Sequence, residues 1–154
     1  MNSKVEIALR DFEQKLNTFL IACGELERLG TWNVRRRGPM VAYFEADLFS
    51  VALQVMVADG VFERSEAEVL NAMFATSYTP RQLSQMYHSS KPVVQDYVDE
   101  DSEDALTLLA GIDEALANEY RELLLDACKI ISLGDGVAEK SERMLIAQLR
   151  EALR

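Results

Sequence analysis

The sequence predicts an all-α protein of about seven helices that folds as a single domain. Apolar residues recur at helical spacing along most of the 154-residue chain, which is the pattern of amphipathic helices. Only three prolines interrupt it, and no sustained alternation of apolar and polar residues indicates a strand. Hydrophobic residues make up 49% of the chain, so a core is available and we expect residues 1–154 to form one domain.

The prolines and the apolar spacing together predict where the helices lie. Proline is tolerated in the first turn of a helix and breaks its interior, so each proline is interpreted as a helix start. One face of a helix over 40–58 carries apolar residues at spacings of four, three and four, namely Phe44, Leu48, Val51 and Val55. The other expected helices cover residues 4–29, 64–76, 80–88, 116–133 and 140–153, with one or two short helices within 92–114.

The chain is strongly acidic, with a formal net charge of −10 and a pI of about 4.6. Such a chain repels phosphate backbones, so we expect no nucleic-acid binding and favour cations and basic proteins as partners. Cys23 and Cys128 lie in apolar stretches and are expected to be buried, reduced thiols. No signal peptide and no run of 18 apolar residues is present, which predicts a cytoplasmic protein without an integral membrane segment.

One acidic segment occurs twice, 76 residues apart. Residues 59–66 are Asp-Gly-Val-Phe-Glu-Arg-Ser-Glu and residues 135–142 are Asp-Gly-Val-Ala-Glu-Lys-Ser-Glu, so six of eight positions are identical. An apolar helix is expected before and after each copy. The repeat therefore predicts two related helix-turn-helix units, over about 40–76 and 116–153.

Local structure alone explains part of this segment. Gly60 and Gly136 can take a positive φ and reverse the chain, and the next one or two apolar residues can close the turn as a plug. The glutamates suit the first turn of the following helix, where carboxylates accept from exposed N–H groups. Ser65 with Glu68 forms a second possible capping box, so the start of that helix stays open within two residues.

The aspartates of the repeat favour a further interpretation, a divalent-metal site. Asp59 and Asp135 are expected near helix C-termini, where a negative charge is unfavourable unless a cation neutralises it. The segment matches positions 5, 6 and 12 of a calcium-binding loop, but positions 1 and 3 would be apolar, so it is not an EF-hand. Calcium or magnesium is the expected ion. The candidate ligands are Asp59, Glu63, Glu66, Asp135, Glu139 and Glu142.

These motifs resemble the tellurite-resistance TerB family. The residues concerned are Val57-Ala58-Asp59-Gly60-Val61 with Glu66, and Leu133-Gly134-Asp135-Gly136-Val137 with Glu142. The resemblance implies about seven helices in two pseudo-symmetric halves, a divalent-metal site at the turns, and a role in tellurite or other chemical stress. It also implies a protein partner, with a membrane-associated complex and a peripheral location as open alternatives. Two departures are Glu63 and Glu139, where the family often has Asp or Ser, and Gly134, where Ala or Ser is usual.

Two functions remain open at this stage. The first is a non-enzymatic, metal-binding stress-response protein, and the alternative is a metal-free interaction module that presents an acidic face to a basic partner. No phosphate-binding loop, nucleophile elbow or Cys/His pair indicates an enzyme. The cluster Arg35-Arg36-Arg37 is expected in a solvated loop, the acidic run 99–104 at a helix start, and Trp32 either at the end of the first helix or on a contact surface.

Overall fold

All regular structure in the described part of the chain is helical, as the sequence predicts. The computed structural model describes residues 3–57, 59–134 and 140–154, without the side chains of 134 and 140–142. Nine helices lie in these ranges: α1 (Ser3–Arg28), α2 (Val34–Arg37), α3 (Met40–Met56), α4 (Arg64–Phe74), α5 (Pro80–Ser89), α6 (Val93–Val98), α7 (Ala105–Ala110), α8 (Glu114–Gly134) and α9 (Lys140–Ala152).

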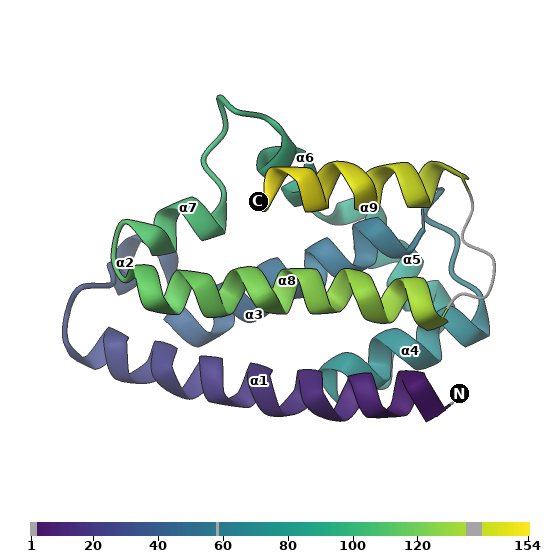
Figure 1. The fold of residues 1–154 in the computed structure, drawn as a ribbon, viewed down its shortest axis with the longest axis horizontal. Helices are drawn as coiled ribbons and strands as arrows, with labels where there is room; N and C mark the ends of the chain where they lie inside the picture. Colours follow the sequence, from purple (N-terminus) through teal and green to yellow (C-terminus); the bar gives the residue numbers. More distant parts are fainter. Residues whose placement is uncertain (1–2, 58, 135–139) are drawn as a thin grey trace.

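Three long helices form the centre of the molecule. Helix α1 packs along α8, and both contact α3; Figure 1 shows α1 running antiparallel to α8, with α3 behind them. Helices α4 and α5 lie at one end of this group, where the chain leaves α3. Helix α9 lies over α3 and contacts α6, while α7 packs on α8.

Aromatic side chains join the three central helices. Phe44 of α3 is fully buried, and its ring centroid lies 5.7 Å from that of Phe19 on α1 and 5.1 Å from that of Tyr120 on α8. Aromatic pairs at these separations stabilise a core beyond the area they bury. The predicted apolar face of α3 is confirmed, since Phe44, Leu48, Val51 and Val55 are all fully buried.

The three prolines begin helices, as predicted. Pro39 and Pro92 are the N-cap residues of α3 and α6, and Pro80 is the first residue of α5. The acidic run also starts a helix, because the Asp104 carboxylate accepts from the Thr107 N–H at 2.7 Å and so caps α7. Within 92–114 the chain thus forms two short helices, α6 and α7.

The segment before α3 differs from the expectation of a plain loop. Residues 34–37 form the short helix α2, because the Asn33 side chain accepts from the Arg36 N–H at 3.1 Å and caps it. Trp32 is buried and donates its indole N–H to the Gly38 carbonyl at 2.9 Å. Of the two interpretations of Trp32, the structure supports the one that places it in the core after the first helix.

Both cysteines are buried, as predicted. Burial raises the pKa of the Cys23 thiol to about 12 and that of Cys128 to about 11, so both stay protonated at neutral pH. None of the described helices is long and apolar enough to cross a membrane.

Candidate functional site

The first acidic turn joins α3 to α4. Helix α3 ends at Met56 and α4 begins at Arg64, with Glu63 as its N-cap residue. The capping box that starts this helix is therefore the one formed by Glu63 and Glu66, and not the one formed by Ser65 and Glu68. Phe62 is buried and Val61 is 62% exposed, so Phe62 is the residue that plugs the turn.

Gly60 holds the turn against the end of α5. Its φ is +76°, and a Cβ added there would lie 2.7 Å from Tyr87 Cδ1 and 2.9 Å from His88 Cε1. The Ser84 hydroxyl donates to the Gly60 carbonyl oxygen. A glycine is needed at this position for two reasons, the positive φ and the close approach of α5.

The carboxylates of the turn mostly bind backbone N–H groups. Asp59 Oδ1 accepts from the Val61 N–H at 2.9 Å, and Glu66 Oε1 accepts from the Glu63 N–H at 2.8 Å. Asp59 lies beyond the end of α3 rather than in its last turn. From the sequence, the charge of Asp59 is expected to be unfavourable because it lies near a helix C-terminus. The hydrogen bond from Val61 offsets part of that cost, because a backbone donor faces the carboxylate.

The predicted metal ligands are only partly visible. Over residues 3–57, 59–134 and 140–154, no three Asp, Glu, His or Cys side chains come together in a way that could hold a metal ion. Asp135 and Glu139 lie outside the described residues, and so does the side chain of Glu142. A site shared by the two turns is therefore a prediction that the described residues do not test.

A second acidic group is partly buried beside a cleft of the molecule. Asp47 is on α3, and its Oδ2 accepts from two hydroxyls, that of Tyr97 on α6 at 2.6 Å and that of Tyr120 on α8. The Tyr120 hydroxyl also lies 3.4 Å from the Phe44 carbonyl oxygen. One carboxylate therefore ties three helices together, and we call Asp47, Tyr97 and Tyr120 the Asp47 network.

Burial dominates the electrostatics of this network. It raises the pKa of Asp47, while the two tyrosine hydroxyls oppose the rise and the charges of Asp104 and Asp96 add to it. Burial also raises the pKa of Tyr97 and Tyr120, so both hydroxyls remain donors. A buried carboxylate is costly unless it is hydrogen-bonded, and two donors on one oxygen supply that compensation.

Sequence reasoning did not identify the Asp47 network. Asp47 occupies a position in the helix that reads as ordinary polar surface beside the apolar face. Its partners follow it by 50 and 73 residues, and no local spacing links them. The only available signal was an aspartate next to the apolar positions Phe44 and Leu48, which is weak on its own.

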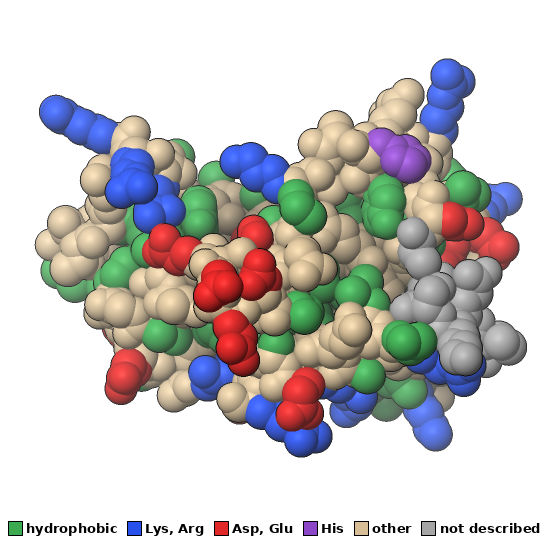
Figure 2. Space-filling view, turned by 90° about the horizontal axis from the view of Figure 1, so that it is seen from above, with side chains coloured by type: hydrophobic (Ala, Val, Ile, Leu, Met, Phe, Trp, Pro, Cys, Tyr) green, Lys and Arg blue, Asp and Glu red, His purple; other side chains and the backbone are tan. Residues whose placement is uncertain are grey.

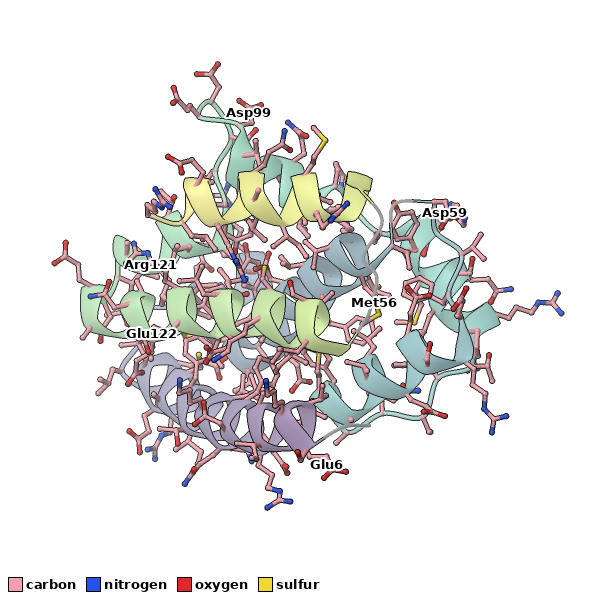
Figure 3. All side chains as sticks on the ribbon, turned by 45° about the vertical axis from the view of Figure 1, so that its right-hand side comes forward. Glu6, Met56, Asp59, Asp99, Arg121 and Glu122 are labelled. Carbon is pink, nitrogen blue, oxygen red and sulfur yellow. The ribbon has the colours of Figure 1, made fainter. Side chains whose placement is uncertain are left out.

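The first acidic turn and the acidic run 99–104 lie well apart. Figure 3 shows Asp59 at the outer edge of the α3–α4 turn and Asp99 on the segment between α6 and α7. Figure 1 places these two segments at different ends of the molecule. These two acids therefore lie on separate parts of the described surface.

A comparison with known families identifies a matching family. The sequence model of the family described as "Tellurite resistance protein TerB" matches residues 45–154, a stretch that includes both acidic turns and the whole Asp47 network. No curated protein and no solved structure matches the chain.

Proposed function

This chain belongs to the tellurite-resistance TerB family, and from that premise we propose that it is a non-enzymatic, cytoplasmic stress-response protein that binds a divalent cation through its two acidic turns. The proposed ligands are the carboxylates of Asp59 and Glu63 from the first turn and of Asp135, Glu139 and Glu142 from the second. Calcium or magnesium suits such a set, because both ions prefer oxygen ligands.

The relative position of the helices supports a shared site. The C-terminal end of α8 and the start of α9 lie at the same end of the molecule as the α3–α4 turn. Helix α9 also contacts both α3 and α8. Since the second acidic segment connects α8 to α9, this arrangement is the single observation that carries the proposal.

The first turn provides carboxylate ligands, but too few of them to enclose an ion on its own. Asp59 and Glu63 are exposed, although Asp59 accepts from the Val61 N–H and Glu63 shares a capping box with Glu66. Two carboxylates from one turn are too few for a tight calcium site, which takes six to eight oxygen ligands. We therefore expect weak binding unless both turns contribute, and a bound ion would fix α4 relative to α9.

Calorimetric titration of the full chain with Ca²⁺ and Mg²⁺ tests the proposal. Asp59→Asn and Asp135→Asn should each weaken binding at least tenfold, and the double variant should abolish it. Glu68→Gln is the matched control, because Glu68 lies on the exposed surface of α4 in an ion pair with Arg64 at 3.7 Å. No binding at millimolar ion, or equal binding by the double variant, would overturn the metal site.

The alternative is a metal-free interaction module, and one feature of the first turn favours it. Val61 is 62% exposed and lies between the exposed acids Asp59 and Glu63. An apolar side chain flanked by carboxylates is suited to a basic partner with an apolar contact. If the calorimetry shows no metal binding, Val61→Ser should weaken association with such a partner while Glu68→Gln leaves it unchanged.

A further inference from the structure

We propose that the cleft beside Asp47 binds an aliphatic amine that carries two or more positive charges. This cleft is a second binding site, separate from the acidic turns and independent of the metal proposed there. It has a volume of about 530 Å³ and lies between the end of α2, α3, α6 and the start of α7. Its polar lining includes Arg37, Tyr43, Asp47, Lys91, Asp96 and Asp104.

One oxygen of Asp47 remains available to a ligand. Both tyrosine hydroxyls donate to Oδ2. Among the described residues no donor reaches Oδ1, although Asp47 lines the cleft. The tyrosines hold the carboxylate in one orientation, and a fixed, largely desolvated carboxylate binds a protonated amine more strongly than a mobile one on the surface.

The charge of the cleft favours a cation. Four acids line it, Asp47, Asp96, Glu103 and Asp104, against the two bases Arg37 and Lys91, so acids outnumber bases by two. Within the described chain, none of these acids forms an ion pair with a base inside 4.0 Å. Figure 2 shows the face that carries the α6–α7 segment, with acidic side chains gathered beside apolar surface and basic side chains near them.

The spacing of the acids favours an extended cation over a metal ion. No three of the described carboxylates are close enough to hold one ion, although Asp47, Asp96 and Asp104 line the same cleft. A chain with separated ammonium groups can reach these acids one at a time. The charges of Asp104 and Asp96 both act on Asp47, so positive charges placed among them would relieve their mutual repulsion.

The remaining wall of the cleft suits the methylene groups of such a ligand. Pro39, Ala42, Ala46 and Val93 line it together with the half-buried ring of Tyr43. An aromatic face attracts an ammonium group, and apolar side chains cover the carbon chain between two amines. These features together select a linear polyamine over a small inorganic cation.

Calorimetric titration of the full chain with spermidine tests this proposal. We expect saturable binding, and Asp47→Asn should weaken it at least tenfold because the amide can still accept from both tyrosines while the charge is lost. Asp96→Asn should weaken it severalfold, and it carries the test if Asp47→Asn does not fold by circular dichroism. Asp11→Asn is the matched control, an exposed acid on α1 that pairs with Lys15, and should change nothing.

The proposal would be overturned by no saturable binding up to millimolar spermidine, by an equal loss in Asp11→Asn, or by unchanged binding in both cleft variants. If Mg²⁺ at equal ionic strength displaced bound spermidine as well as added spermidine does, the binding would be only charge screening, which would also overturn the proposal.

Butylamine, which has one charge, should bind at least tenfold more weakly than spermidine. Equal binding by butylamine would contradict the requirement for several charges and point to a single lysine side chain of a partner. The metal titration of the acidic turns is unaffected by either outcome.

Discussion

The first acidic turn and the Asp47 network use carboxylates in opposite ways. In the turn, Asp59 and Glu63 are exposed, and the carboxylates of Asp59 and Glu66 accept from backbone N–H groups close in sequence. In the network, Asp47 is partly buried and accepts from hydroxyls on two distant helices. Local capping explains much of the turn, whereas no local interaction explains why the carboxylate of Asp47 is partly buried among three helices.

The repeated motif and the partly buried carboxylate of Asp47 therefore mark two different features of the molecule. The repeat identifies the family and the turn, and its conformation is set mainly by Gly60 and the end of α5. The buried carboxylate identifies a cleft that no motif marks.

Gly60→Ala should be the most damaging change in either region. A positive φ costs a non-glycine residue about 1–2 kcal/mol, and overpacking against Tyr87 and His88 adds about 1–3 kcal/mol. Gly30→Ala is the matched control, since Gly30 has a φ of +83° with no atom within 4 Å of the added Cβ. Urea denaturation of both variants measures the difference. Equal losses would show that the contact with α5 does not constrain the turn.

Tyr120→Phe should destabilise the protein by about 1.5–3 kcal/mol, because it removes a hydrogen bond to a buried carboxylate. Tyr97→Phe should cost less, since Tyr97 is 6% exposed and Tyr120 is fully buried. A double-mutant cycle with Asp47→Ala, which removes both acceptor oxygens, followed by urea denaturation, measures the coupling. Additive losses in that cycle would mean that the hydroxyls and the carboxylate do not act as one network.

Glu66→Ala should cost about 1 kcal/mol, the usual effect of losing one partner in a capping box. Glu66→Gln should change stability little, because a glutamine at this position still accepts from the Glu63 N–H. Thermal unfolding distinguishes the two variants. If Glu66→Gln lost as much stability as Glu66→Ala, the charge rather than the cap would be what α4 requires.

The smallest expected effect is the contribution of Asp47 to the pH dependence of the free energy of unfolding. Burial raises its pKa above the ordinary value of 3.8, so the folded state binds a proton at a higher pH than the unfolded state. The free energy of unfolding of the wild type, relative to Asp47→Asn, should therefore increase as the pH falls through the raised pKa toward 3.8. Urea denaturation between about pH 7 and pH 4 measures this difference, and a decrease over that window would contradict the burial of the charge.

The sequence predicted the features of this molecule that depend on local interactions. Pro39, Pro80 and Pro92 begin helices because the ring restricts the backbone wherever it occurs. The apolar face of α3 is buried because helical spacing alone decides which residues share a face. The family followed from the repeated turn, since both of its copies lie within the matched residues 45–154.

Features that depend on distant residues escaped prediction. Helix α2 forms because Asn33 caps it and the buried Trp32 precedes it, and three consecutive arginines gave no sign of this. The hydrogen bonds of Asp47 join residues 50 and 73 positions apart, and only the packing of α3, α6 and α8 brings them together. The sequence alone indicated that the charge of Asp59 needs a cation to neutralise it. The hydrogen bond from the Val61 N–H to Asp59 weakens that inference, because a backbone donor already faces the charge.

The most direct test of two separate cation sites is a pair of titrations of the full chain followed in amide NMR spectra. Calcium should shift the amides around Gly60 and Gly136 with one common affinity, and spermidine should shift those around Asp47, Asp96 and Asp104. Asp59→Asn should weaken only the first response at least tenfold, and Asp47→Asn should weaken only the second by at least as much. A single set of amides that responds to both ligands, or shifts near Gly60 without shifts near Gly136, would contradict this account.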